Sequence, residues 1–194
     1  MIRARGLERR FGEKRVFRAL DFDVAERDFL LVTGPNGSGK STLLALCAGL
    51  LAPTKGELEV RAPRQLIGYL AHEPLVYREL TALENLDLFG SLYRIAERRE
   101  RIGMLLERFD LWDARHERVA ALSRGMSQRL ALCRALLHEP ELVLADEPYS
   151  GLDEAGAELL DGLLAGLAGE RTLVLATHDP QRVAELATQR LALA

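Results

Sequence analysis

The nine residues 34–42, GPNGSGKST, constrain the fold more than any other part of this chain. They match G-x-x-x-x-G-K-[ST], the pattern of a phosphate-binding loop. The apolar segment 28–33 before them predicts a strand, and the segment 41–50 after them predicts a helix. Because a strand before and a helix after are the context in which this pattern binds phosphate, the sequence predicts a nucleoside triphosphate site.

The residue types of the loop fit that chemistry. Glycines let the backbone turn tightly and present N–H groups to an anion, and the following helix adds the positive end of its dipole. We expect Lys40 to reach the β- and γ-phosphates of ATP and the Ser41 hydroxyl to bind Mg²⁺. The expected phosphate contacts are Gly34, Pro35, Asn36, Gly37, Ser38, Gly39, Lys40, Ser41 and Thr42. The loop alone leaves kinases, GTPases, helicases and transport ATPases open.

Composition narrows the class of protein. The 194 residues suit one domain, and a net charge of −3 argues against nucleic acid as the main partner. Cys47 and Cys133 lie in apolar helical patterns, which predicts buried free thiols and a reducing compartment. The chain has no run of about 18 apolar residues and no apolar core of signal-peptide type at its start, so we expect no membrane span.

Strands and helices alternate along most of the chain. Strands are predicted at residues 2–7, 16–24, 57–60, 66–70, 141–145, 171–176 and 190–193, and helices at 41–50, 154–167 and 180–187. A nearly continuous helical block lies between residues 81 and 137, and it begins with a capping box formed by Thr81 and Glu84. Strands that feed helices predict a parallel sheet with helices on both faces, which binds its ligands at the carboxyl ends of the strands.

Two polar motifs follow predicted strands at the edge where the phosphate loop also lies. Asp146 ends an apolar strand, where it can hold Mg²⁺, and Glu147 can polarise an attacking water. His178 follows a neighbouring strand, from which it can contact a γ-phosphate. A surface acid pair and a structural histidine are the alternatives.

The segment 122–129, LSRGMSQR, opens a helix. Ser123 is a good N-cap residue, and Gly125 allows close approach of a backbone. This helix end is either an ordinary cap or a second phosphate site. A single subunit has no use for a second phosphate site, whereas in a two-fold dimer it can close over the ATP of the partner.

Phe11 lies at the turn between the first two predicted strands. An aromatic residue at a hairpin end can belong to the core, or its ring can stack on an adenine at little cost in side-chain entropy. The residues alone leave both interpretations open.

Together these motifs resemble the ATP-binding subunits of ABC transporters, over essentially the whole chain. Residues 34–42 are similar to Walker A, and residues 142–147 to Walker B with its catalytic glutamate. Residues 122–126 are similar to the LSGGQ signature, residues 150–153 to the D-loop, and His178 to the switch histidine. Phe11 matches the adenine-stacking aromatic of the family, with Val16 at a companion contact.

The resemblance implies an α/β fold of the P-loop NTPase (RecA-like) type, with a parallel sheet core, an N-terminal antiparallel β part and an inserted α-helical subdomain. The chain would be a single ABC ATPase domain. Residues 1–72 and 138–194 would form the nucleotide-binding core, and residues 73–137 the helical subdomain. The implied nucleotide contacts outside the phosphate loop are Phe11, Val16, His72, Ser123, Gly125 and Asp153.

The resemblance also implies how the site works. Two subunits would pair head to tail around two ATP molecules, each site taking Lys40, Ser41 and Asp146 from one chain and Ser123 and Gly125 from the other. The catalytic residues would be Lys40, which holds phosphate, Glu147, which activates water, and His178, which senses or holds the γ-phosphate. Ser41 and Asp146 would hold Mg²⁺. Closing and reopening would drive a separate membrane permease through the surface near residues 72–80, at the cytoplasmic face of the cell membrane.

Three positions depart from the family pattern. In the signature, Arg124 replaces the first glycine and Met126 the glutamine, and His72 replaces the usual glutamine of the Q-loop. A neutral imidazole nitrogen can act on Mg²⁺ or water as a glutamine carbonyl does, but an imidazolium cannot coordinate a metal. We therefore expect activity to fall on mild acidification more steeply than in a His72→Gln variant, and equal pH profiles would contradict this.

The small size, the segment HEPLVYRELTALENL and the signature LSRGM are similar to the haem-exporter ATPases of cytochrome c maturation. The leading alternative is an ABC-2-type drug, lipid or polysaccharide exporter subunit, which also favours LSRGM-like signatures. A non-transport ABC ATPase acting on ribosomes or DNA would usually carry two such domains, a long coiled coil or a basic face. A P-loop metabolite kinase would leave residues 123–126 unexplained.

Overall fold

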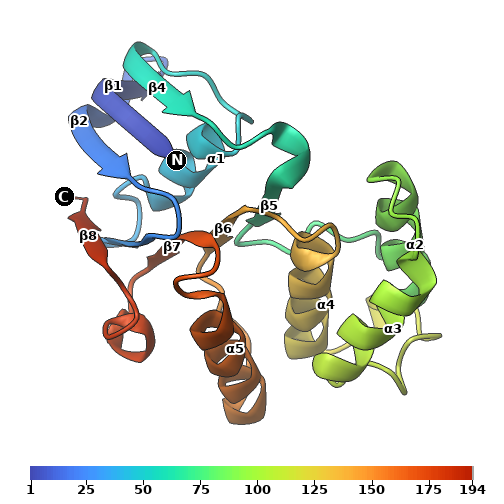
Figure 1. The fold of residues 1–194 in the computed structure, drawn as a ribbon. Coiled ribbons are helices and arrows are strands. Elements are labelled where there is room, and N and C mark those ends of the chain that lie inside the picture. The colour runs from blue at the N-terminus through green and yellow to red at the C-terminus, as the bar shows by residue number, and fades with distance from the viewer. Residues whose placement is uncertain (194) are drawn as a thin grey trace.

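The structure, a computed structural model, describes residues 1–193, which form two β-sheets (Figure 1). The larger sheet has the order β5-β6-β7-β3-β8, with all neighbouring strands parallel: β3 (Phe29–Thr33), β5 (Ile67–Leu70), β6 (Leu142–Asp146), β7 (Thr172–Thr177) and β8 (Gln189–Ala192). The smaller sheet is antiparallel with the order β2-β1-β4: β1 (Ile2–Phe11), β2 (Lys14–Val24) and β4 (Lys55–Val60). The predicted α/β fold, with a parallel core and an N-terminal antiparallel part, is confirmed.

The sequence of β3 shows why the parallel sheet is covered on both faces. Side chains alternate between the two faces of a strand. Phe29 and Leu31 belong to one hydrophobic core, and Leu30 and Val32 belong to the other. All four side chains are buried, as a continuous apolar run requires in a strand with packing on both sides.

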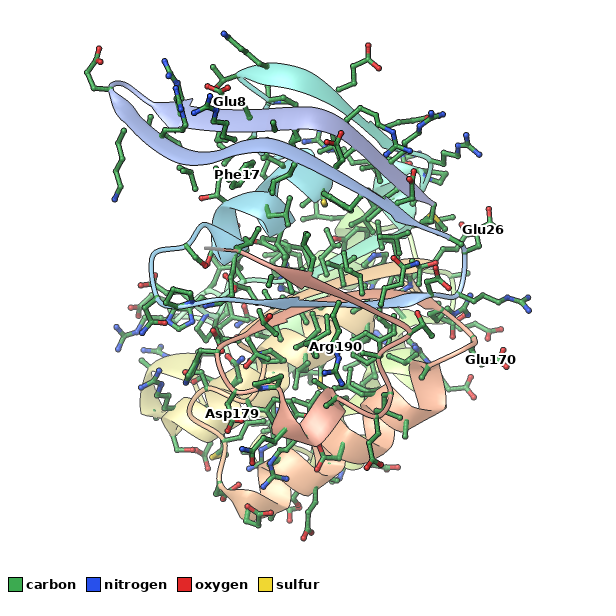
Figure 2. The ribbon with its side chains drawn as sticks, turned by 90° about the vertical axis from the view of Figure 1, so that its left-hand side faces the viewer. Glu8, Phe17, Glu26, Glu170, Asp179 and Arg190 are labelled. Atoms are coloured by element: carbon green, nitrogen blue, oxygen red, sulfur yellow. The ribbon has the colours of Figure 1, made fainter. Side chains whose placement is uncertain are left out.

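The helices occupy separate layers. Helix α1 (Lys40–Cys47) lies between the two sheets, where it contacts β4, β6 and β7 (Figure 1). Figure 2 shows side chains filling this layer, among them Phe17 of β2. On the other face of the parallel sheet lie α4 (Arg124–Leu136) and α5 (Glu154–Leu167). Helices α2 (Ala82–Leu92) and α3 (Arg98–Arg108) pack against each other and against α4.

Several local predictions are confirmed. In the capping box, Thr81 Oγ1 accepts from the backbone N–H of Glu84 over 3.1 Å, and Glu84 Oε2 accepts from that of Thr81 over 2.8 Å. Helix α5 has the predicted bounds. Cys47 and Cys133 are free and buried, and burial raises the pKa of the Cys47 thiol to about 12. Among residues 1–193, no helix is both long enough and apolar enough to cross a membrane.

Two helix predictions need correction. The helix predicted at residues 180–187 is only a single 3₁₀ turn, η3 (Gln181–Val183). Short helices are marginal without tertiary support, and here the chain turns back at once into β8, with the Thr188 hydroxyl accepting from Phe29 N over 2.9 Å. Helix α1 ends at Cys47 instead of residue 50, because Gly49 adopts φ 69° and closes the helix in the left-handed conformation. Two more 3₁₀ turns, η1 (Arg64–Leu66) and η2 (Val119–Ala121), connect other elements.

Candidate functional site

The carboxyl ends of β3 and β6 border a pocket of about 380 Å³. This volume lies in the range of small-molecule sites. Residues from the β1–β2 turn, the phosphate loop, the segment after β5 and the end of β6 line the pocket: Phe11, Lys14, Val16, Asn36, Gly37, Gly39, Lys40, Ser41, Thr42, His72, Asp146 and Glu147. The fold thus brings together residues that the sequence presented as separate motifs.

The phosphate loop approaches β2 so closely that a side chain does not fit at Gly39. This residue has φ 101°, and a Cβ built on it would lie 2.5 Å from Val16 Cγ1. Gly39 precedes α1 without any side-chain cap, so the first N–H groups of the helix have no side-chain partner. A helix end of this kind is a binding site for an anion such as a phosphate.

Lys40 places a buried cation between the loop and the end of β6. Its side chain is only 6 % exposed, and Nζ donates to the carbonyl oxygens of Gly34 over 2.8 Å and Pro35 over 3.3 Å. The same Nζ lies 3.4 Å from Glu147 Oε1. The ammonium group is therefore held at the centre of the loop, within reach of the acidic end of β6.

Asp146 is a carboxylate without a full set of partners. The residue is 1 % exposed, and its Oδ1 has no hydrogen-bond partner. Burial raises the pKa of Asp146, and the hydrogen bond from the Ser41 hydroxyl and the nearby His72 partly offset this rise. A buried, unpaired carboxylate oxygen beside a hydroxyl fits Mg²⁺, which proteins hold through one or two carboxylates together with substrate phosphates. Asp146 and Ser41 thus suit the predicted Mg²⁺.

Glu147 is held in an unusual conformation by several contacts. It has φ 47°, in the left-handed region that side chains other than glycine rarely adopt, and its N–H donates to Ala176 O over 2.8 Å. Its Oε2 accepts from Thr177 Oγ1 over 3.0 Å and lies 2.9 Å from His178 Nδ1. Strained backbone that the surroundings enforce is common at functional sites, and this carboxylate is only 12 % exposed.

Some of the predicted site residues lie outside the pocket lining. Ser123 caps α4 by accepting from Met126 N over 3.1 Å, and Asp153 caps α5 by accepting from Gly156 N over 2.9 Å. Gly125 and His178 do not line the pocket either, although His178 contacts Glu147. Within the phosphate loop, Gly34, Pro35 and Ser38 are not in the lining: the first two accept from Lys40, and Ser38 Oγ is buried without a partner.

Sequence reasoning missed two residues of the site. Lys14 lines the pocket and pairs with Phe11 across the β1–β2 hairpin, a register that the strand pattern alone does not give. Thr177 ends β7 in register with Thr33 of β3 and bonds to Glu147. Its position directly before His178 was the signal there.

Comparison with known proteins gives a consistent result. A family model described as ABC transporter matches residues 17–150. The chain is 39 % identical over 194 residues to the daunorubicin resistance ATP-binding protein DrrA3 of Streptomyces coeruleorubidus, covering 94 % of this chain and 61 % of the relative. It is 38 % identical over 185 residues to the uncharacterized ABC transporter ATP-binding protein YxlF of Bacillus subtilis (strain 168), covering 92 % of this chain and 62 % of that relative. The chain therefore spans about three fifths of the length of these two relatives.

A solved structure is similar throughout. It is the dimeric post-hydrolysis state of the ATP-binding cassette MJ0796 bound to ADP and Pi, with a TM-score of 0.90 and 30 % sequence identity. The match covers 100 % of this chain and 94 % of that chain. The likeness thus extends from the parallel sheet to the antiparallel part and the helices between β5 and β6.

Proposed function

The chain belongs to the ABC transporter family, and we propose that it is the subunit that binds and hydrolyses ATP for an exporter with a separate membrane permease. One observation carries the proposal: Asp146, which ends β6, and Glu147, which follows it, line the same pocket as Lys40 and Ser41. The two adjacent carboxylates have different surroundings and therefore suit different roles: Asp146 can hold Mg²⁺, and Glu147 can activate water. The cytoplasmic face of the membrane is the place that this function implies.

In the proposed reaction, the oxygen of a water molecule bonds to the γ-phosphorus, and the bond from that phosphorus to the β–γ bridging oxygen breaks. Glu147 takes a proton from the attacking water, and Thr177 and His178 orient its carboxylate. Lys40 neutralises charge on the β- and γ-phosphates. When bound, Mg²⁺ neutralises further charge on the phosphate oxygens, held by Asp146 and Ser41.

The proposed assembly is a head-to-tail dimer around two ATP molecules. The N-terminus of α4, with Ser123 and Gly125, lies outside the pocket of its own chain. In the dimer each α4 completes the pocket of the partner with its free backbone N–H groups. The dimeric state of the similar cassette supports this arrangement.

Two cargoes remain candidates for the exporter. The segment 72–86 and the signature at residues 122–126 support haem export for cytochrome c maturation. The likeness to a daunorubicin resistance protein supports an ABC-2-type drug exporter instead. Deleting the gene distinguishes them: loss of haem-loaded cytochrome c supports the first, and sensitivity to an anthracycline with normal cytochrome c supports the second.

The activity itself is tested with purified protein and Mg²⁺-ATP. We expect phosphate release without any acceptor substrate, and its loss in a Lys40→Ala variant, because the buried ammonium is the main cation for the phosphates. A Lys55→Ala variant serves as the control, because Lys55 is an exposed lysine of β4 outside the pocket lining, and it should keep the parental turnover. ADP formation that requires an acceptor would instead support a kinase.

A further inference from the structure

Arg124 lies in the first turn of α4, where the family signature has a glycine. Its side chain extends over the loop that follows β6. Nη2 donates a hydrogen bond of 3.0 Å to Ser150 Oγ. The stem crosses Gly151 so closely that a Cβ built on this glycine would lie 2.8 Å from Arg124 Nε and 2.9 Å from its Cγ and Cδ. Gly151 has φ 81°, a backbone conformation that favours glycine over residues with a side chain.

Two more contacts join α4 to the same loop. The buried side chain of Gln128 donates from Nε2 to Pro148 O over 3.2 Å. The backbones also approach closely, because a Cβ built on Gly125 would lie 3.0 Å from Gly151 O. The loop 148–151 is therefore held by α4 from end to end.

This loop continues directly from Glu147. Ser150 N donates to Glu147 O over 3.0 Å, so the turn closes on the residue whose backbone is in the left-handed conformation. This hydrogen bond connects Ser150 directly to the backbone of Glu147.

We propose that Arg124 is a positioning residue that couples the α4 end bearing Ser123 to the loop bearing Glu147. When a partner's nucleotide engages Ser123, the bond from Arg124 to Ser150 sets Glu147 in the pocket of its own chain. The inference rests on the proposed ATP hydrolysis, and it gives a role to Arg124, which stands where the family signature has a glycine.

The test is a double-mutant cycle between Arg124 and Ser150. Arg124→Gln and Ser150→Ala each lower kcat about fivefold, the factor that a lost hydrogen bond of ordinary net strength is worth, and leave the KM for ATP within about twofold. The double variant is no slower than Arg124→Gln alone, because both changes remove the same bond. Arg124→Lys, which keeps a cation of similar reach, recovers most of the lost rate.

Arg129 provides a matched control on the same helix. Its Nη1 donates to Phe109 O over 3.0 Å, on the side of α2 and α3, away from the loop 148–151. Arg129→Gln lowers the melting temperature and leaves kcat unchanged. If the Arg124 and Ser150 effects multiply in the double variant, or if Arg124→Gln leaves kcat unchanged, the proposal is wrong.

Hydrogen exchange separates this proposal from the proposed function. In the nucleotide-free protein, Arg124→Gln must speed amide exchange in residues 149–153, and Arg129→Gln must not. Equal exchange in parent and Arg124→Gln overturns the coupling whether or not the parent hydrolyses ATP. Absence of phosphate release from the parent overturns the proposed function instead.

Discussion

The Thr177 hydroxyl donates a 3.0 Å hydrogen bond to Glu147 Oε2, which joins the ends of the neighbouring strands β7 and β6. Thr177 is 3 % exposed, so little water is available to replace it. The same carboxylate oxygen lies 2.9 Å from His178 Nδ1, and the other lies 3.4 Å from Lys40 Nζ. The proposed base is thus fixed from three directions.

The first prediction concerns this hydrogen bond. Thr177→Val keeps the shape of the side chain and removes the donor, so we expect kcat to fall about tenfold because the carboxylate loses one of its fixed partners. Thr177→Ser keeps the donor and should stay close to the parental kcat. ATP affinity, measured by equilibrium binding, should not change in either variant. Equal rates in the valine and serine variants would contradict the positioning role.

The second prediction concerns Asp146 and pH. Its pKa is raised in the folded protein, chiefly by burial, so the stability it contributes at low pH is lost as the pH rises through the raised pKa. Asp146→Asn removes this unpaired buried charge, and without ligand it should be more stable than the parent at neutral pH by about 1–3 kcal/mol. Melting curves should show this difference shrinking as the pH falls toward the ordinary range of a carboxyl group.

We expect Mg²⁺-ATP to reverse the order of stability of the parent and the Asp146→Asn variant. Mg²⁺-ATP should raise the melting temperature of the parent much more than that of Asp146→Asn, because the variant lacks the carboxylate for the metal. The proposed metal site would be contradicted if Asp146→Asn were less stable than the parent without ligand. It would also be contradicted if Mg²⁺-ATP raised the melting temperatures of both proteins equally.

The third prediction concerns Phe11, a residue that is 47 % exposed and has the Arg9 guanidinium 4.4 Å from its ring centroid. Phe11→Ala should weaken ATP binding about tenfold with little change in kcat, since stacking on a base is worth about 1–3 kcal/mol. Phe11→Tyr should bind like the parent. Trp112 is a control of the same kind, 41 % exposed with Arg115 4.1 Å from its ring, and Trp112→Ala should leave ATP affinity unchanged.

The sequence was enough to predict those elements that depend only on residues close together in the chain. The glycine loop, the capping box at Thr81 and the alternating or continuous apolar runs each depend on neighbouring residues, and the structure contains all of them. Asp146 and His178 could be placed at one edge because parallel strands end together. The helix predicted at residues 180–187 failed because its conformation depends on how β8 returns to β3.

Some contacts of the site could not be predicted from the sequence, because they join segments that lie far apart in the chain. The bond between Arg124 and Ser150 spans 26 residues, and the bond between Thr177 and Glu147 spans 30. Each bond depends on how α4, β6 and β7 pack in the folded protein, and the hydrophobic pattern of the sequence does not predict this packing. Lys14 enters the pocket because of the hairpin register opposite Phe11, and strand patterns do not fix such a register alone.

The fourth prediction concerns the proposed base. Glu147→Gln removes the proton acceptor and keeps the size of the side chain, so turnover should fall at least about a hundredfold while ATP still binds. With ATP trapped, the variant should become a dimer, which light scattering or analytical ultracentrifugation measures. Hydrolysis at the parental rate would show that Glu147 is not the base.

The site shared between two subunits would be visible in the structure of the Glu147→Gln protein with Mg²⁺-ATP. We expect Ser123 of one subunit within hydrogen-bonding distance of the γ-phosphate that Lys40 of its partner holds. Finding Ser123 remote from every triphosphate, in each assembly that the variant forms, would contradict a nucleotide site shared between two subunits.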